Sequence, residues 1–188
     1  MTTDMTDTLV TRPTVPTESA LVVLAPAAEA LVKPFRDRWD PAAAAGVPAH
    51  VTVLYPFHPP AALAPAIAAR LARLFAQHAP FDYQLTELRR FPSVLYLAPE
   101  PAAPFRALTA AVAGAFPEYP PYGGQFDNVI PHLTVAEQHD ADQLAAIEHD
   151  VRAACGHRLP LRLRAEAVVL LDNERGAWRV RATFALGG

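Results

Sequence analysis

Hydrophobic positions along the chain follow two spacings, one typical of strands and one typical of helices. Short runs of β-branched and large apolar residues predict strands, whereas apolar residues three or four positions apart predict helices. The predicted strands are residues 21–24, 50–55, 83–90, 94–97, 132–135, 159–170 and 178–186. The predicted helices are residues 63–78, 105–115 and 140–154. A further helix through residues 31–39 is expected to kink or start late, because Pro34 cannot donate a helical hydrogen bond.

One short pattern occurs twice along this series of elements. Residues 48–53 read PAHVTV and residues 130–135 read IPHLTV. Because successive side chains of a strand alternate between its faces, His50 and Thr52 project to the same side. His132 and Thr134 do the same in the second copy. Each predicted strand therefore presents one imidazole and one hydroxyl together.

Two further repeats accompany this pattern and indicate a duplication. Residues 24–26 and 97–99 both read LAP, and residues 34–36 and 104–106 both read PFR. The element order is strand-helix-strand-helix-strand, then the same again with a final strand. We therefore predict an α+β fold with two pseudo-symmetric lobes built from a duplicated β-α-β-α-β unit. The two His-x-Thr strands should line a central cleft.

Length and composition favour a single domain. A chain of 188 residues with 52% hydrophobic residues can bury one sizeable core. We expect residues 1–18, rich in threonine and lacking a signal-peptide pattern, to form a disordered N-terminal tail, and residues 19–188 to form one bilobed domain. The single cysteine, Cys155, excludes an internal disulfide, and no apolar run approaches the ~20 residues of a membrane span. These features predict a cytoplasmic monomer without membrane contact.

Charge favours a small phosphate-bearing ligand. The formal net charge of −3 argues against binding a long duplex through many phosphate contacts. Arginine, whose planar fork suits phosphate recognition, is concentrated in the last quarter, where Arg162 and Arg164 would share one strand face. The alternative is that these arginines simply form a solvated strand face.

The paired histidines suggest acid–base chemistry around a phosphodiester. Opening a cyclic phosphate requires one proton to be removed from the attacking oxygen and another to be delivered to the leaving oxygen. Two imidazoles with a pKa near ~6.5 can do both, one neutral and one protonated. Hydroxyl groups such as those of Thr52 and Thr134 can donate to the phosphate oxygens. A metal site is the alternative for the histidines, but no third ligand has supporting spacing, and we expect neither a metal nor another cofactor.

The doubled motif resembles the 2H phosphoesterase superfamily, which includes the 2′-5′ RNA ligase-like proteins. The resemblance covers roughly residues 19–186 and is most specific in residues 46–57 (GVPAHVTVLYPF). It implies that His50 and His132 are the catalytic pair and that Thr52 and Thr134 hold the phosphate. The chain departs from some relatives in one respect, because Glu137 stands where they carry a basic residue after the second motif. An arginine for the phosphate must then come from elsewhere, or the ligand differs.

Aromatic residues near the two motifs are candidates for stacking on a nucleobase. Tyr55, Tyr96 and Tyr122 are the substrate-binding candidates, with ordinary core packing as the alternative. The expected substrates are 2′,3′-cyclic phosphate ends or short 2′-5′-linked nucleotides, cleaved without metal, with weak reverse RNA ligation also open. A non-catalytic protein that binds nucleotides or RNA ends in the same cleft is the other class that the sequence allows. The sequence does not decide which histidine is the base.

Overall fold

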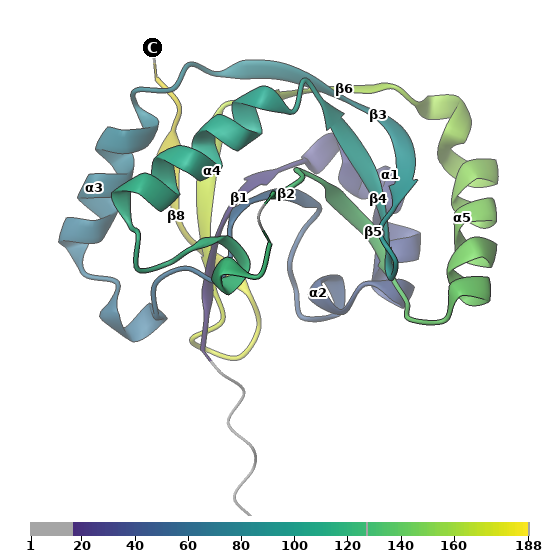
Figure 1. Cartoon of the computed structure of the whole chain (residues 1–188), viewed down its shortest axis with the longest axis horizontal. Helices are drawn as coiled ribbons and strands as arrows, with labels where there is room; N and C mark the ends of the chain where they lie inside the picture. Colours follow the sequence, from purple (N-terminus) through teal and green to yellow (C-terminus); the bar gives the residue numbers. More distant parts are fainter. Residues whose placement is uncertain (1–16, 127, 188) are drawn as a thin grey trace, which may run out of the picture.

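The computed structural model describes residues 17–126 and 128–187, which form two curled antiparallel sheets flanked by helices (Figure 1). The elements are β1 (Ser19–Leu24), α1 (Pro26–Trp39), α2 (Pro41–Ala44), β2 (His50–Leu54), η1 (Pro60–Ala62), α3 (Pro65–Phe75), β3 (Phe81–Arg90), β4 (Val94–Glu100), α4 (Ala103–Ala115), η2 (Pro121–Gly124), β5 (Leu133–Glu137), α5 (Ala141–Cys155), η3 (Gly156–Arg158), β6 (Leu161–Ala165), β7 (Ala167–Asp172) and β8 (Arg179–Ala185). The η elements are short 3₁₀ helices.

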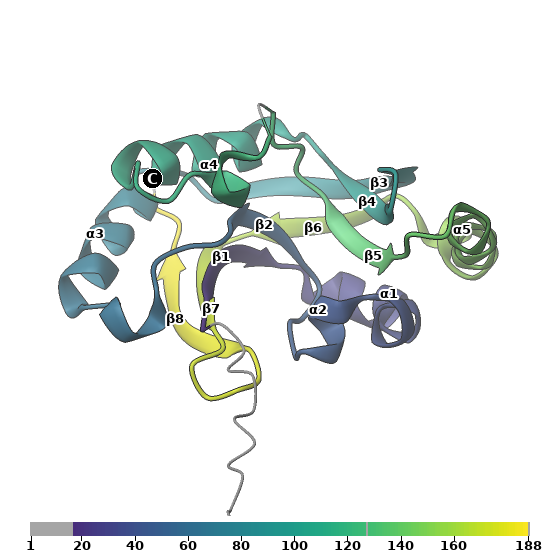
Figure 2. The ribbon, with the colours of Figure 1, turned by 60° about the horizontal axis from the view of Figure 1, so that its bottom comes forward.

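The two sheets have equivalent topologies. The first has the strand order β2-β1-β7-β8, and the second has the order β5-β4-β3-β6. The strands that carry the two motifs, β2 and β5, are therefore the edge strands of their sheets. They contact each other where the sheets meet, and Figure 2 shows both strands near the middle of the molecule. The predicted α+β fold, with two pseudo-symmetric lobes and the His-x-Thr strands at a central cleft, is confirmed.

Each lobe is assembled from both halves of the chain. Helix α4, from the second half, packs on β2 of the first sheet, and α1, from the first half, packs on β5 of the second. Strands are exchanged as well. The first-half strand β3 pairs with β4 of the second half, and the second-half strand β7 pairs with β1 of the first half. Figure 1 shows α3 and α4 on one side of the molecule and α5 on the other. The two motif strands are thus held by helices from the opposite half of the sequence.

Alternation along the motif strands separates the core from the cleft. Val51 and Val53 of β2 and Leu133 and Val135 of β5 are buried in one continuous hydrophobic core. The opposite face of the first sheet carries a smaller buried cluster, formed by Ala20, Val22, Val47, Val169 and Leu171. The intervening His and Thr residues of both motifs stay partly exposed. Burial of the apolar face therefore fixes which side chains reach the cleft.

Two of the sequence-based element boundaries are wrong. The single strand expected over 159–170 is two strands, β6 and β7, which belong to different sheets and are separated by Glu166. The apolar pattern continues across this break, so periodicity alone could not reveal it. Helix α1 starts at Pro26, earlier than expected, and continues through Pro34, which is exposed. A proline at the helix start is favourable because its missing N–H would be unpaired there anyway.

The repeated PFR tripeptide does not mark equivalent positions. Arg36 is buried near the C-terminal end of α1, whereas Arg106 is exposed in the first turn of α4. The helix predicted from residue 140 is confirmed as α5, with Asp140 as its N-cap, since Asp140 Oδ1 accepts a 2.8 Å hydrogen bond from the Gln143 amide. The N-terminal tail expected over 1–18 lies outside the described residues, apart from its last two positions. No helix in the described ranges is long and apolar enough to cross a membrane.

Candidate functional site

A β-bulge occurs at the same position in both motifs. In β2, Thr52 lies opposite Val22 and Leu54 lies opposite Leu21, so that Val53 is an additional residue between the two pairs. An extra residue of this kind bends the strand and changes the face reached by the residues that follow.

The equivalent bulge in β5 is at Val135. Thr134 lies opposite Tyr96 and Ala136 lies opposite Leu95, again with one residue between the pairs. As a result, the residue three positions after each threonine returns to the face of the histidine. These residues are Tyr55 in the first motif and Glu137 in the second, and both line the same pocket.

A side chain from the other half of the chain supports the first bulge. Thr109 of α4 is buried, and its Oγ1 donates a 2.8 Å hydrogen bond to the Val53 carbonyl. A bulge interrupts the regular ladder and leaves backbone groups without strand partners. The threonine therefore satisfies the carbonyl at the point where β2 leaves regular pairing.

The pocket between the two sheets has a volume of about 440 Å³. It contains both His-x-Thr pairs, and the charge of His132 affects the ionisation of His50. The remaining lining residues come from both sheets, α2 and the loops: Glu18, Ala20, Val22, Asp40, Pro41, Ala42, Ala45, Val47, Tyr55, Tyr122, Glu137, Leu171 and Trp178. The structure thus brings together four of the predicted site residues from strands 82 positions apart in the sequence.

The two imidazoles are held in the same way. His50 Nδ1 lies 2.7 Å from the Pro48 carbonyl, and His132 Nδ1 lies 2.7 Å from the Ile130 carbonyl. A carbonyl can only accept, so Nδ1 carries the proton in each neutral ring and Nε2 has the free lone pair. Each motif therefore prepares an imidazole whose Nε2 can take or return a proton.

Burial favours the neutral form of both histidines. Desolvation lowers the pKa of His50 to about 4, while its bond to the Pro48 carbonyl opposes the shift. Desolvation also lowers the pKa of His132. Arg36 adds a further lowering effect at His50. Both imidazoles of the pocket are consequently neutral at neutral pH.

Two of the three candidate tyrosines line the pocket. Tyr55 donates a 2.7 Å hydrogen bond to Glu18 Oε2, and burial together with this bond raises its pKa to about 12. Tyr122 has a left-handed backbone conformation with φ of 51°, and its amide donates to the Tyr55 carbonyl. Burial raises the pKa of Tyr122, opposed by a hydrogen bond with the Thr52 side chain. Both phenols are protonated, and the Tyr55 proton is donated to Glu18.

Tyr96 lies behind His132 and outside the pocket lining. The residue is 4% exposed, and its ring stacks on Phe91 with centroids 4.3 Å apart. The edge contact between Tyr96 and His132 has a centroid distance of 5.5 Å. Phe91 also meets His132 edge-on, at 5.2 Å. The two stacked rings thus fix the plane of the imidazole from outside the pocket.

A buried ionic network supports the segment that precedes His50. Arg36 is almost fully buried, and its Nε donates a 2.9 Å hydrogen bond to Asp40 Oδ2 while Nη2 donates to the Val47 carbonyl at 3.0 Å. Glu29 accepts a hydrogen bond from the Ala49 amide. This network was not predicted from the sequence, although a charged residue on the apolar face of a helix, with a carboxylate four positions later, is a usable signal.

The pocket wall opposite the second sheet depends on a glycine. Trp178 packs edge-on against Tyr55 with centroids 6.3 Å apart, and its amide donates to the Ala45 carbonyl. Gly46 next to it has a φ of +96°, and a Cβ there would lie 3.3 Å from the Trp178 carbonyl oxygen. Both the backbone conformation and the close approach therefore favour glycine. Trp178 and Glu18 are lining residues that the sequence did not reveal.

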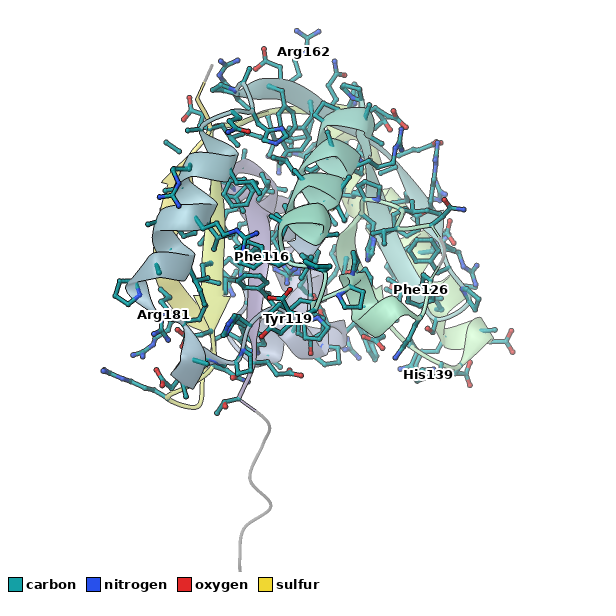
Figure 3. The ribbon with its side chains drawn as sticks, turned by 60° about the vertical axis from the view of Figure 1, so that its left-hand side comes forward. Phe116, Tyr119, Phe126, His139, Arg162 and Arg181 are labelled. Atoms are coloured by element: carbon teal, nitrogen blue, oxygen red, sulfur yellow. The ribbon has the colours of Figure 1, made fainter. Side chains whose placement is uncertain are left out.

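A second, mainly apolar hollow of about 630 Å³ adjoins His132. It shares His132, Tyr122 and Glu137 with the first pocket, and its other lining residues are Phe91, Pro92, Ser93, Val94, Phe126, Asn128, Val129 and Ile130. Phe126 is 59% exposed at its rim. Figure 3 shows Phe126 well separated from Phe116 and Tyr119, which lie below α4.

The C-terminal arginines considered as phosphate ligands lie elsewhere. Arg162 and Arg164 are exposed on β6, where they line a separate hollow, and Arg164 pairs with Asp82 at 3.0 Å. This arrangement agrees with the alternative of a solvated strand face. Among the described residues, no group of three His, Cys, Asp or Glu side chains is placed to hold a metal ion.

Comparisons with known proteins agree with this geometry. The family model of the 2′-5′ RNA ligase superfamily matches residues 24–177. The fold is similar to that of TT0787 of Thermus thermophilus, with a TM-score of 0.56, 22% identity and coverage of 91% of this chain and 98% of that one. It is also similar to E. coli LigT complexed with 3′-AMP, with a TM-score of 0.59, 14% identity and coverage of 93% and 100%.

No protein of curated function matches the sequence. The solved structures are too distant in sequence to show more than the fold. The family match includes both His-x-Thr motifs, both bulges and most of the pocket lining. On this evidence the chain belongs to the 2′-5′ RNA ligase superfamily.

Proposed function

We propose that the protein is a metal-independent phosphodiesterase that acts on 2′,3′-cyclic phosphate ends or short 2′-5′-linked nucleotides. The observation that carries this proposal is the matched pair of imidazoles in one pocket. Each is bonded through Nδ1 to a carbonyl at 2.7 Å, and each has a threonine beside it. Such a pair supplies both proton transfers that phosphodiester cleavage requires.

The reaction on a cyclic phosphate proceeds with water as the nucleophile. One neutral histidine removes a proton from the water as its oxygen bonds to phosphorus. The bond from phosphorus to one ring oxygen breaks, and the second histidine, protonated, delivers a proton to that oxygen. Positioned proton transfer of this kind contributes on the order of 10²–10⁴ in rate. The Thr52 and Thr134 hydroxyls donate to the non-bridging oxygens as negative charge accumulates there.

We assign the base to His50 and the acid to His132. Burial lowers the pKa of His50 to about 4, so that its Nε2 is free to accept a proton over a wide pH range. His132 is also held neutral, but the negative charge of a bound phosphodiester favours its protonated form. With these roles, one pocket supplies both the base and the acid that the reaction needs.

A nucleotide substrate is supported by the lining of the pocket and by the relatives. E. coli LigT has been solved with 3′-AMP and with NADP⁺. Here Tyr55 and Tyr122 line the pocket, and an apolar hollow with an exposed aromatic ring adjoins it. We propose that the tyrosines contact the sugar or base, while Tyr96 positions His132 from behind. We further propose that the protein is a cytoplasmic monomer that needs no cofactor and catalyses the reverse ligation weakly.

The test is a phosphorus NMR assay with adenosine 2′,3′-cyclic phosphate and a 2′-5′-linked diadenylate. The expected result is conversion of at least one compound to a phosphomonoester or free nucleoside products by the wild-type protein. The His50→Ala variant serves as the matched control and should give little product. Binding of both compounds without turnover would refute the phosphodiesterase proposal and support a non-catalytic nucleotide-binding protein.

A further inference from the structure

The side chains of the pocket lining that are charged at neutral pH are all acidic. Among the described lining residues, Glu18, Asp40 and Glu137 carry carboxylates, and none is arginine or lysine. This is an unusual environment for an anionic substrate, because like charges at close range weaken binding. The three carboxylates differ, however, in how far their charge is compensated.

Asp40 and Glu18 have partners within the protein. Asp40 is buried and bonded to the Arg36 guanidinium, which balances its charge. Glu18 accepts the hydrogen bond from the Tyr55 phenol. Glu137 is exposed, and within the described ranges its carboxylate has neither a hydrogen bond nor an ion pair. Glu137 is therefore the carboxylate whose charge acts most fully on a ligand.

The position of Glu137 follows from the bulge in β5. The bulge returns Glu137 to the face of Thr134, and both residues line the pocket. The equivalent residue of the first motif is Tyr55, which burial and Glu18 keep protonated and neutral. Of these two matched positions, only Glu137 brings a charge into the pocket.

Arg38 is a cation that lies near Glu137, on the side away from the histidine pocket. Arg38 of α1 and Glu137 both line a shallow neighbouring hollow, outside the histidine pocket. The Arg38 guanidinium lies 4.6 Å from the centre of the Trp39 ring, and no ion pair joins it to Glu137 among the described residues. Within the described part of the chain, Arg38 therefore forms no ion pair that would neutralise the Glu137 carboxylate.

A charge at this place distinguishes two kinds of phosphate ester. A phosphodiester, cyclic or linear, carries one negative charge, whereas a phosphomonoester carries about 1.5 to 2 near neutral pH. We propose that Glu137 makes the pocket select singly charged phosphodiesters and reject doubly charged phosphomonoesters, so that the product is expelled. This inference rests on the proposed function and names the residue that sets its charge selectivity.

The experiment measures binding without requiring turnover. Calorimetry at about pH 8, where the phosphate of adenosine 3′-monophosphate is dianionic, gives dissociation constants for this probe and for uncharged adenosine. The proteins are wild type, Glu137→Gln and Glu137→Arg. Glu118→Gln is the matched control, since Glu118 is an exposed carboxylate outside the pocket.

Removing the like charge should tighten binding of the monophosphate by roughly three- to tenfold in Glu137→Gln, and further in Glu137→Arg. Binding of adenosine should not change in either variant, and the control should behave as wild type. Thermal melts establish that the variants are folded. The inference is overturned if neither folded Glu137 variant binds the monophosphate more tightly than wild type.

The outcome is separable from that of the proposed function. If the Glu137 variants bind the monophosphate more tightly than wild type but no cyclic phosphate is cleaved, the phosphodiesterase proposal fails and the charge selection stands. If a cyclic phosphate is cleaved but the variants bind the monophosphate no more tightly than wild type, only the role of Glu137 fails. Inhibition of turnover by adenosine 3′-monophosphate should follow the binding series in an active enzyme.

Discussion

The buried ion pair between Arg36 and Asp40 provides a sharp test of how the His50 segment is supported. Their side chains are 1% and 3% exposed, and the Arg36 Nε to Asp40 Oδ2 distance is 2.9 Å. Arg36→Met keeps a long apolar stem but leaves the Asp40 carboxylate buried without its cation. Removing one partner of such a pair costs about 3–5 kcal/mol.

This free energy corresponds to a large change in melting temperature. For a chain of this size each kcal/mol lowers Tm by about 2–4 °C, so the Arg36→Met variant should melt roughly 10 °C below wild type. The variant should also have a lower kcat at about 25 °C, where it is still folded, since the Val47 carbonyl loses its donor and the segment before His50 is loosened. Differential scanning calorimetry and steady-state kinetics measure the two effects.

Two further variants isolate the cause. Asp40→Asn keeps the side-chain oxygen that caps α2 through the Ala42 amide. Combined with Arg36→Met it removes both charges and should restore part of the lost Tm, because no unpaired charge is left buried. Lys33→Met breaks an exposed pair with Asp37 at the same spacing on the same helix, and should hardly change Tm. A Tm for Arg36→Met within about 2 °C of wild type would refute the reasoning.

Three other predictions concern the bulge, the pH profile and metal independence. Thr109→Val should lower the free energy of unfolding in urea by about 1–3 kcal/mol, because the Val53 carbonyl is left unpaired; an unchanged midpoint would show that the bond is dispensable. The pH profile of kcat/KM should be bell-shaped, with an acid limb near 4 for His50 and a basic limb below 6.5 for His132. An optimum for kcat/KM above about pH 8 would contradict the assigned roles. Folding stability should decrease as pH falls from 6.5 towards 4, because these histidines take up protons at a higher pH in the unfolded chain than in the folded chain. Activity should persist in excess EDTA, whereas a loss restored by zinc or manganese would make the histidines metal ligands.

The fold class and the four motif residues could be predicted because their signals are local. His50, Thr52, His132 and Thr134 lie in short alternating strands, and alternation directly gives the shared face. The duplication followed from repetition of the same local pattern. The PFR match shows the limit of this reasoning, since identical tripeptides occupy a buried and an exposed position in their helices.

What escaped prediction depends on contacts between distant segments. The split at Glu166 and the exchange of α1 and α4 between lobes arise from tertiary packing, which sequence periodicity does not encode. The bulges at Val53 and Val135 are visible only in the pairing of strands. They explain why Tyr55 and Glu137, each three positions after a motif threonine, line the pocket. The source of an arginine for the phosphate was left open by the sequence, and the described pocket lining contains none.

The most direct test of the central claim is the kinetics of His50→Ala, His132→Ala and the double variant on a cyclic phosphate substrate. If the histidines divide the acid and base roles, each single variant should lose on the order of 10²–10⁴ in kcat with little change in substrate affinity. The double variant should be little worse than either single variant, since the pair acts as a unit. A single variant with nearly wild-type kcat would contradict the account, because one motif would then only bind.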